Sequence, residues 1–215
     1  LTRGGLARLA PALARVPSLD GRSAGERAVA LAASLGAPDG AGHTTNLVTA
    51  DSEGNACVMT TSLGLGSGDF LPGFDVHLNS MLGEADLLVG RLEPGERMKS
   101  MMAPTAVLDG SGLEVASGSA GGTRLRSALV QVLAAILDEG DDPQAAVDRP
   151  RLHPAGEVVH LEPGFADDAL RALEGGGWTL RCWPVKHHYF GGVSLVARSG
   201  AAADPRRSGA VRRPA

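Results

Sequence analysis

The pattern of apolar and polar residues first indicates two helices and a linker near the start of the chain. Apolar residues recur at a spacing of three to four over residues 6–16 and over residues 23–35, which predicts two amphipathic helices. Ser23 and Glu26 have the spacing of a capping box at the start of the second helix. Residues 36–43 carry no hydrophobic period and are rich in glycine, so we expect a linker there.

Strand-like patterns follow the linker. Residues 46–51 and 55–62 flank a turn at 52–54, which is typical of a β-hairpin. Residues 103–109 and 113–118 predict a second hairpin around a Gly-Ser-Gly turn. Between the hairpins we expect a loop at 64–74 and a short stretch of mixed structure at 76–88.

The second half of the chain alternates between helical and strand-like segments. One long helix is predicted after residue 123, because its apolar residues fall on one face before a stop at Gly140. That apolar face consists of Leu125, Leu129, Val132, Leu133 and Ile136. The other predictions are helices at 143–149 and 165–177, strands at 157–162, 178–183 and 191–197, and a surface tail at 201–215.

This order of elements indicates a fold class. Two hairpins, then a pair of helices, then further strands favour an antiparallel, layered α+β fold. The pattern does not fix the order of the layers.

Composition narrows the possible partners. The formal net charge is −4, which gives no general reason to bind nucleic acid. No apolar stretch reaches the roughly 20 residues of a membrane-spanning helix. Cys57 and Cys182 fit no metal or redox spacing, and we expect two buried thiols. The chain begins at Leu1, so we expect its natural N-terminus to lie upstream, and the sequence leaves the cellular compartment undecided.

The pair Thr44-Thr45 carries the most specific chemistry in the sequence. It stands between the linker and the first predicted strand, after His43. Cleavage between His43 and Thr44 would place a free α-amine beside a hydroxyl on one residue, and that amine can serve as the base for the hydroxyl. An α-amine has a pKa of about 7.7–8.0, so a useful fraction is neutral near pH 7. The simpler interpretation is that the two threonines only begin a β-strand.

Six segments in order resemble the C-terminal part of a γ-glutamyltransferase (γ-glutamyltranspeptidase) precursor, a member of the N-terminal nucleophile hydrolases. They are GHTTNLVTADSEGNA (42–56), LNSMLGEADL (78–87), RMKSMMAPT (97–105), GSAGGTR (118–124), DRPRLH (148–153) and ADPRRSGA (203–210). The resemblance implies a four-layer αββα sandwich, of which this chain forms only a part. It also implies autocatalytic cleavage between His43 and Thr44.

The resemblance further implies two subunits that stay together. Residues 1–43 would be the end of the large subunit with its linker, and residues 44–215 would be the catalytic small subunit. The large subunit, mostly absent from this chain, would be the partner. The donor would be a γ-glutamyl compound such as glutathione, and the acceptor an amino acid, a peptide or water. This chemistry requires neither a metal nor an organic cofactor.

The resemblance assigns catalytic roles to four residues. Thr44 would be the nucleophile, Ser62 would support it with a hydroxyl, and Thr45 would remain structural. The N–H groups of Gly121 and Gly122 would form an oxyanion hole, where each donor is worth about 3 kcal/mol. From the residues alone, this glycine segment could also be a tight strand-to-helix turn or a phosphate loop, although the Walker pattern is absent.

The substrate-binding positions depart from the family pattern. Glu84 stands where an aspartate binds the substrate's α-ammonium, and Met81 replaces a glutamine. Of two serines that hold the α-carboxylate only Ser100 remains, and Lys99 could supply the missing charge. Glu84 could also belong to a solvated loop, and Lys99 could be merely solvated. Gly64 replaces an asparagine. These changes reduce specificity for a complete γ-glutamyl group.

Two other functions stay open at this point. A glutaryl-type acylase would share the fold and the nucleophile without an ammonium clamp. A non-catalytic fragment could instead serve as a structural partner. His153, His187 and His188 do not predict a metal site, because adjacent histidines in a strand point to opposite faces.

Overall fold

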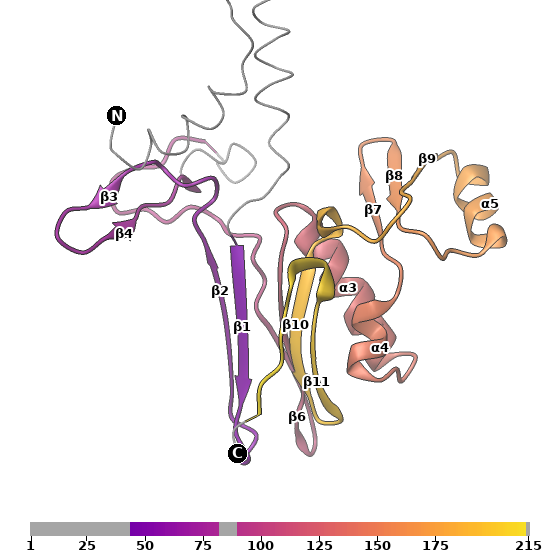
Figure 1. The fold of residues 1–215 in the computed structure, drawn as a ribbon, viewed down its shortest axis with the longest axis horizontal. Helices are drawn as coiled ribbons and strands as arrows, with labels where there is room; N and C mark the ends of the chain where they lie inside the picture. The colour runs from indigo at the N-terminus through magenta and orange to yellow at the C-terminus, as the bar shows by residue number, and fades with distance from the viewer. Residues whose placement is uncertain (1–43, 82–89, 214–215) are drawn as a thin grey trace, which may run out of the picture. The chain divides into compact units, whose positions relative to one another are not determined.

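The computed structural model describes residues 44–81 and 90–213 (Figure 1). In chain order the elements are β1 (Thr44–Ala50), β2 (Ala56–Ser62), β3 (Phe70–Leu71), β4 (Val76–His77), β5 (Thr105–Asp109), β6 (Gly112–Ala120), α3 (Arg124–Leu137), α4 (Pro143–Asp148), β7 (Leu152–Ala155), β8 (Val158–Leu161), α5 (Asp167–Gly175), β9 (Thr179–Cys182), η3 (His188–Phe190), β10 (Gly192–Ala197), β11 (Gly200–Ala203) and η4 (Pro205–Arg207). The helices predicted at 6–16 and 23–35 lie outside the described residues.

The described residues divide into two compact units. The first contains Thr44 together with the described part of 62–99, and the second contains 45–61 and 100–213. In the first unit, β3 and β4 pair antiparallel, with Phe70 opposite His77. The rings of these two residues stack with centroids 4.7 Å apart. The sequence predicted a loop over the stretch that contains β3, so that prediction missed a short strand.

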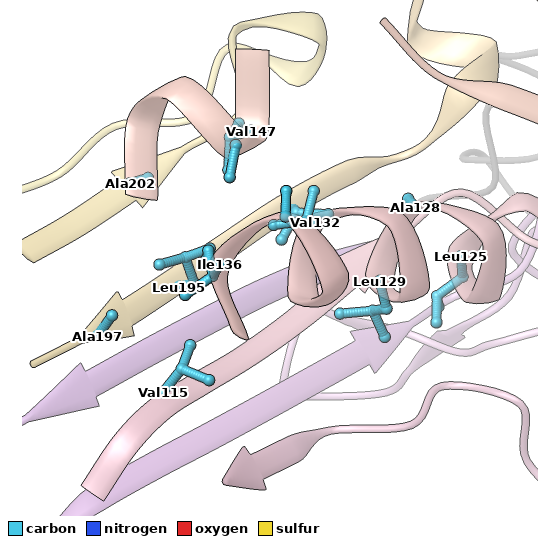
Figure 2. Close-up of a cluster of buried hydrophobic side chains, with 13 residues drawn as sticks. Val115, Leu125, Ala128, Leu129, Val132, Ile136, Val147, Leu195, Ala197 and Ala202 are labelled. Carbon is cyan, nitrogen blue, oxygen red and sulfur yellow. The ribbon is translucent and has the colours of Figure 1, made fainter. Parts of the chain in front are cut away.

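The second unit is built on a four-stranded antiparallel sheet in the order β11-β10-β6-β5. Helices α3 and α4 cover one face of this sheet, and their side chains form the core with those of the strands (Figure 2). The long helix was predicted correctly, because its apolar face is the face that is buried. The buried residues of α3 are Leu125, Ala128, Leu129, Val132, Ala135 and Ile136.

The hairpin of β1 and β2 lies against the opposite face of the same sheet. Val115 of β6 packs among the core residues under α3. Successive residues of a strand face opposite sides of the sheet, so Gly118, three residues further on, faces away from the helices. A Cβ atom on Gly118 would lie 2.0 Å from the Asn46 side-chain nitrogen. Gly118 therefore gives β1 room to approach β6 closely. Helices, sheet and hairpin form three successive layers in this unit, in agreement with the predicted α+β class.

A smaller sheet in the order β7-β8-β9 completes the second unit. β7 and β8 are antiparallel, and β8 and β9 are parallel, with α5 connecting the parallel pair. The sequence predicted β8, α5 and β9 but missed β7. Pro154 hides β7 in the sequence pattern, yet a proline is acceptable there because β7 is an edge strand.

The C-terminal segment corrects a prediction. Residues 201–215 were expected to be a surface tail; residues 208–213 are exposed as expected, but β11 pairs with β10 at the edge of the main sheet. Ala202 and Asp204 are buried, and the Arg206 side chain is only 1% exposed. The arginine-rich composition is misleading because Arg206 is paired inside the fold, with Glu162 from a distant part of the chain and with Asp204.

The two cysteines also correct a prediction, because Cys57 and Cys182 are both exposed, free thiols. Cys57 lies on β2 and Cys182 ends β9, an edge strand of the smaller sheet. Within the described part of the chain, no helix is long and apolar enough to cross a membrane.

Candidate functional site

Thr44 begins β1, and its hydroxyl is already paired. The Oγ atoms of Thr44 and Ser62 lie 3.0 Å apart, across the ends of the two hairpin strands. The Gly64 N–H donates to the Ser62 hydroxyl oxygen at 3.0 Å. One lone pair of Ser62 is used in this way, so its proton or its remaining lone pair is left for the bond to Thr44, in which either hydroxyl can be the donor. The structure thus brings together two of the residues that the sequence singled out.

Gly64 contributes in a way that the sequence did not indicate. Its φ is +58°, in the left-handed region that glycine adopts without strain. This conformation lets the chain turn directly after the N–H that bonds to Ser62. A backbone donor therefore contacts the supporting hydroxyl at the position where the family pattern has an asparagine.

The start of the predicted substrate-clamping loop is attached to the same turn. The Ser80 hydroxyl accepts from the Leu65 N–H at 3.0 Å, and the Ser80 N–H donates to the Leu63 carbonyl at 2.9 Å. Met81 follows directly and donates its N–H to the Asn79 side chain at 3.0 Å. These bonds fix residues 78–81 close in the structure to Ser62.

The remaining predicted binding residues are not assembled by the described structure. Glu84 and His43 lie outside the described residues. Lys99 and Ser100 are exposed, and the Ser100 hydroxyl accepts from the Met102 N–H at 3.2 Å. Met102 packs against the main core, so the segment that carries Ser100 is anchored at its far end.

The paired glycines form the turn between β6 and α3. Gly121 has a φ of +141° and Gly122 a φ of +58°. Their carbonyls accept from the N–H groups of Arg124 and Leu125 at 3.2 Å and so begin the helix. Among the described residues no acceptor is found for the N–H of either glycine. Gly122 is exposed, so its N–H is available to a ligand.

The turn packs closely against the segment that leads from η3 into β10. A Cβ on Gly121 would lie 2.8 Å from the Cα of Gly191. A Cβ on Gly192 would lie 2.6 Å from the Arg207 side chain. The segment that leads from η3 into β10 therefore presses backbone against backbone at the glycine turn. At Gly121 both the positive φ and the backbone contact require glycine, whereas a side chain at Gly192 would displace the Arg207 side chain.

A buried ion-pair network holds that segment, and it joins two of the motifs quoted above. Arg151 of DRPRLH pairs with Asp204 of ADPRRSGA at 2.6 Å, and both side chains are 2% exposed. Arg206 pairs with Glu162 at 2.5 Å. Burial lowers the pKa of Arg151, and the charge of Asp204 partly offsets that effect. For Arg206 burial is the largest single effect and opposes the charge, but the hydrogen bonds to Glu162 and Asp204 and their negative charges together outweigh it and raise the pKa.

The network bonds directly to the backbone around the turn. Arg151 donates from Nη1 to the Gly191 carbonyl at 3.3 Å. Glu162 accepts from the His187 N–H at 3.1 Å, and Asp204 accepts from the Val193 N–H at 3.0 Å. Both carboxylates thus fix the chain on either side of Gly191.

Sequence reasoning assigned no role to these four charged residues. The available signal was the two arginine-containing motifs themselves, since Arg151, Asp204 and Arg206 all lie in them. Glu162 gave a weaker signal, because it follows a strand whose apolar residues predict burial. Their pairing could not be predicted, because it joins segments about 50 residues apart.

The histidines do not form a metal site in the described part of the chain, where no group of three or more His, Cys, Asp or Glu side chains is placed to hold an ion. His153 is buried, and its Nδ1 lies 2.8 Å from the Ser127 hydroxyl. Burial lowers the pKa of His153 to about 4, and the charge of Arg124 adds to the effect. His187 and His188 do not lie in a strand, contrary to expectation. Their ring centroids are 4.0 Å apart, at the start of η3.

Comparisons with known proteins show which family and fold the chain resembles. Residues 16–213 match the family model for gamma-glutamyltranspeptidase. The glutathione hydrolase proenzyme of Bacillus subtilis strain 168 is 29% identical over 179 residues, which are 79% of this chain and 30% of that protein. The Acylase ACY 1 proenzyme of Pseudomonas sp. strain V22 is 28% identical over 60% of this chain and 24% of its own length. This chain therefore spans less than a third of either relative.

A solved structure extends the likeness to the fold. Gamma-glutamyltranspeptidase from Pseudomonas nitroreducens, complexed with L-DON, superimposes with a TM-score of 0.67 at 25% identity. The match covers 80% of this chain and all of the matched chain. The fold is thus the α+β fold of the N-terminal nucleophile hydrolases.

Proposed function

Because the chain belongs to the gamma-glutamyltranspeptidase family, we propose that it contains the catalytic small subunit of a γ-glutamyl hydrolase or transferase precursor. Thr44 is the proposed nucleophile. The observation that carries the proposal is the 3.0 Å hydrogen bond between the hydroxyls of Thr44 and Ser62. Ser62 stands opposite Thr44 at the ends of the two hairpin strands, and because a backbone N–H holds its hydroxyl, the proposed nucleophile meets an oriented hydrogen-bond partner.

The first proposed step is cleavage of the precursor. The Thr44 hydroxyl attacks the carbonyl carbon of His43, and the peptide bond becomes an ester on Oγ. Water then hydrolyses the ester, which leaves a carboxylate on His43 and a free α-amine on Thr44. The names of the B. subtilis and Pseudomonas relatives, both proenzymes, support a precursor of this kind.

The second proposed step is acyl transfer. The Thr44 hydroxyl attacks a γ-glutamyl amide while its α-amine takes the proton. Negative charge develops on the carbonyl oxygen, and the N–H groups of Gly121 and Gly122 are the proposed donors to it. The amine then gives the proton to the leaving nitrogen. Water or an acceptor amine finally displaces the acyl group from Thr44.

A glutaryl-type acylase is the second candidate. The match to Acylase ACY 1 supports it, as do Met81 and Met101 at positions where the family pattern has polar residues. An acylase of this type would bind a glutaryl group, which has no α-ammonium, so it would need no residue to bind one. The large subunit, glutathione as donor and an amino acid, peptide or water as acceptor remain parts of the first proposal.

A comparison of two substrates tests these candidates. We expect the precursor that contains this chain to hydrolyse a γ-glutamyl anilide faster than a glutaryl anilide. Faster glutaryl hydrolysis would favour the acylase. Thr44→Ala is expected to abolish turnover of both anilides. Full turnover in that variant would contradict Thr44 as the nucleophile, and no turnover of either anilide by the wild type would favour a non-catalytic partner.

A further inference from the structure

The charges around the glycine turn do not cancel. In the buried network, Arg151 and Arg206 are compensated by two carboxylates. Arg207, the next residue, forms no ion pair among the described residues, and the same holds for Arg124 at the start of α3. The turn is therefore bordered by two arginines that form no ion pair with a described carboxylate, and the charge of Asp204 offsets that of Arg207 only in part.

Arg207 borders the turn on the side of Gly121. Its aliphatic stem fills the space beside Gly192, and its Nη2 donates to the His188 carbonyl at 3.2 Å. The same Nη2 lies 3.6 Å from the position that a Cβ on Gly121 would occupy. Its Nε is buried without a hydrogen-bond partner among the described residues.

Arg124 borders the turn on the side of Gly122. Its Nε donates to the Tyr189 carbonyl at 3.1 Å, and its guanidinium lies 4.8 Å from the centre of the Tyr189 ring. Its Nη1 lies 3.8 Å from the position of a Cβ on Gly122. The two arginines thus bond to consecutive carbonyls and converge on consecutive glycines.

This arrangement is costly unless negative charge is also present. Burial lowers the pKa of Arg207, the charge of Arg124 lowers it further, and the charge of Asp204 only partly offsets these two effects. Like charges that converge in a partly buried place repel each other. Neutral donors such as glutamine could hold the carbonyls of His188 and Tyr189 without that repulsion. The electrostatic cost is explained if an anion forms at the turn.

We propose that Arg124 and Arg207 are electrostatic positioning residues, which strengthen the interaction of the Gly121–Gly122 turn with the negatively charged oxygen of a tetrahedral acyl intermediate. The inference rests on the proposed function. The arginines act through the turn, by keeping its N–H groups in place and by adding positive potential. They contribute to the transition state and little to binding of the neutral amide, because the amide oxygen carries no full charge.

The test compares neutral and charged replacements. Arg124→Gln and Arg207→Gln remove the charge, and Arg124→Lys and Arg207→Lys keep it. Arg126→Gln is the matched control, since Arg126 is an exposed arginine on the same helix. Each variant is assayed as the processed enzyme with a γ-glutamyl anilide, with rates normalised to the cleaved fraction. Inhibition is measured with a boronic acid analogue of the γ-glutamyl group, which becomes a tetrahedral anion on the threonine.

We expect each glutamine variant to lose about tenfold in kcat, with KM changed less than twofold, and to bind the boronate about tenfold more weakly. The lysine variants should recover most of both losses, and Arg126→Gln should behave as wild type. Glutamine variants with wild-type kcat and boronate affinity would overturn the inference. So would lysine variants as impaired as the glutamine variants, because the arginines would then act only through their shape.

The outcomes separate this inference from the proposed function. Wild-type turnover in Thr44→Ala would refute the proposed function itself. Loss of turnover in Thr44→Ala, together with unchanged glutamine variants, would refute only the role of the arginines. If a glutamine variant is not cleaved or does not fold, the lysine variant at the same position is measured instead. Near wild-type kcat and boronate affinity in that variant support the inference, and a tenfold loss of both overturns it.

Discussion

At the scale of single residues, the hydroxyl of Ser62 is the contact on which the proposed nucleophile most depends. It lies 3.0 Å from the Thr44 Oγ and is oriented by the Gly64 N–H. A hydroxyl held in this way fixes the rotamer of Thr44 before a substrate arrives. Preorganisation of this kind accounts for a large part of what an active site contributes to the rate.

We therefore predict that Ser62→Ala lowers kcat for a γ-glutamyl anilide by about tenfold, the effect of losing roughly 1.4 kcal/mol of transition-state stabilisation. Ser62→Thr, which keeps the hydroxyl, should retain most activity. Thr61→Ala is the control, because Thr61 is the exposed neighbour on the same strand. Equal rates in Ser62→Ala and Thr61→Ala would show that the Ser62 hydroxyl has no part in the reaction.

At the scale of elements, the close approach of β1 to β6 depends on Gly118. Its missing side chain leaves room for Asn46, whose Nδ2 donates to the Thr60 hydroxyl at 2.8 Å. Asn46 lies on the strand that Thr44 begins, and Gly118 lies on the strand that leads into the glycine turn. A change at Gly118 therefore affects both elements that carry the proposed chemistry.

Gly118→Ala is predicted to destabilise the protein by about 1–3 kcal/mol, the usual cost of overpacking. Gly110→Ala is the matched control, since nothing lies within 4 Å of a Cβ at that position. Thermal unfolding of both variants measures the difference. A melting temperature for Gly118→Ala equal to that of Gly110→Ala would mean that the two strands can separate without cost.

Elements with a strong period were predictable from the sequence. The long helix shows five apolar positions on one face, and the hairpin of β1 and β2 shows alternation around a Gly-containing turn. β7 and β11 were missed for physical reasons. β7 contains Pro154, and β11 is a run of glycine and alanine that carries no alternation. Tertiary pairing decides the conformation of such segments.

The candidate site was predictable only in part. Motifs single out Thr44, Ser62 and the two glycines as candidates, and their catalytic roles stay predictions. The buried network and the two flanking arginines were not identified. Their roles depend on which charged side chains lie close together, and this is decided by the tertiary fold.

At the scale of the whole molecule, the buried network makes the C-terminal segment part of the structural core. Glu162 bonds to Arg206, to the backbone of Arg151 and to the backbone of His187. Its side chain is fully buried. Removal of one partner from such a network leaves a buried charge without compensation, which typically costs about 3–5 kcal/mol.

Glu162→Gln is accordingly predicted to lower the free energy of unfolding by about that amount, with a clear drop in the urea midpoint. The control is Asp109→Asn, which breaks the exposed pair with Arg198. Exposed pairs contribute little because water screens them. An equal, small effect of both substitutions would contradict the structural role given to the network.

The central claim is that Thr44 becomes the first residue of a separate subunit and acts as its nucleophile. N-terminal sequencing of the small fragment, after incubation of the precursor that contains this chain, tests it most directly. The account predicts a fragment that begins Thr-Thr-Asn-Leu-Val and is absent from Thr44→Ala. A single uncleaved chain, a different first residue, or the same fragment in Thr44→Ala would contradict it.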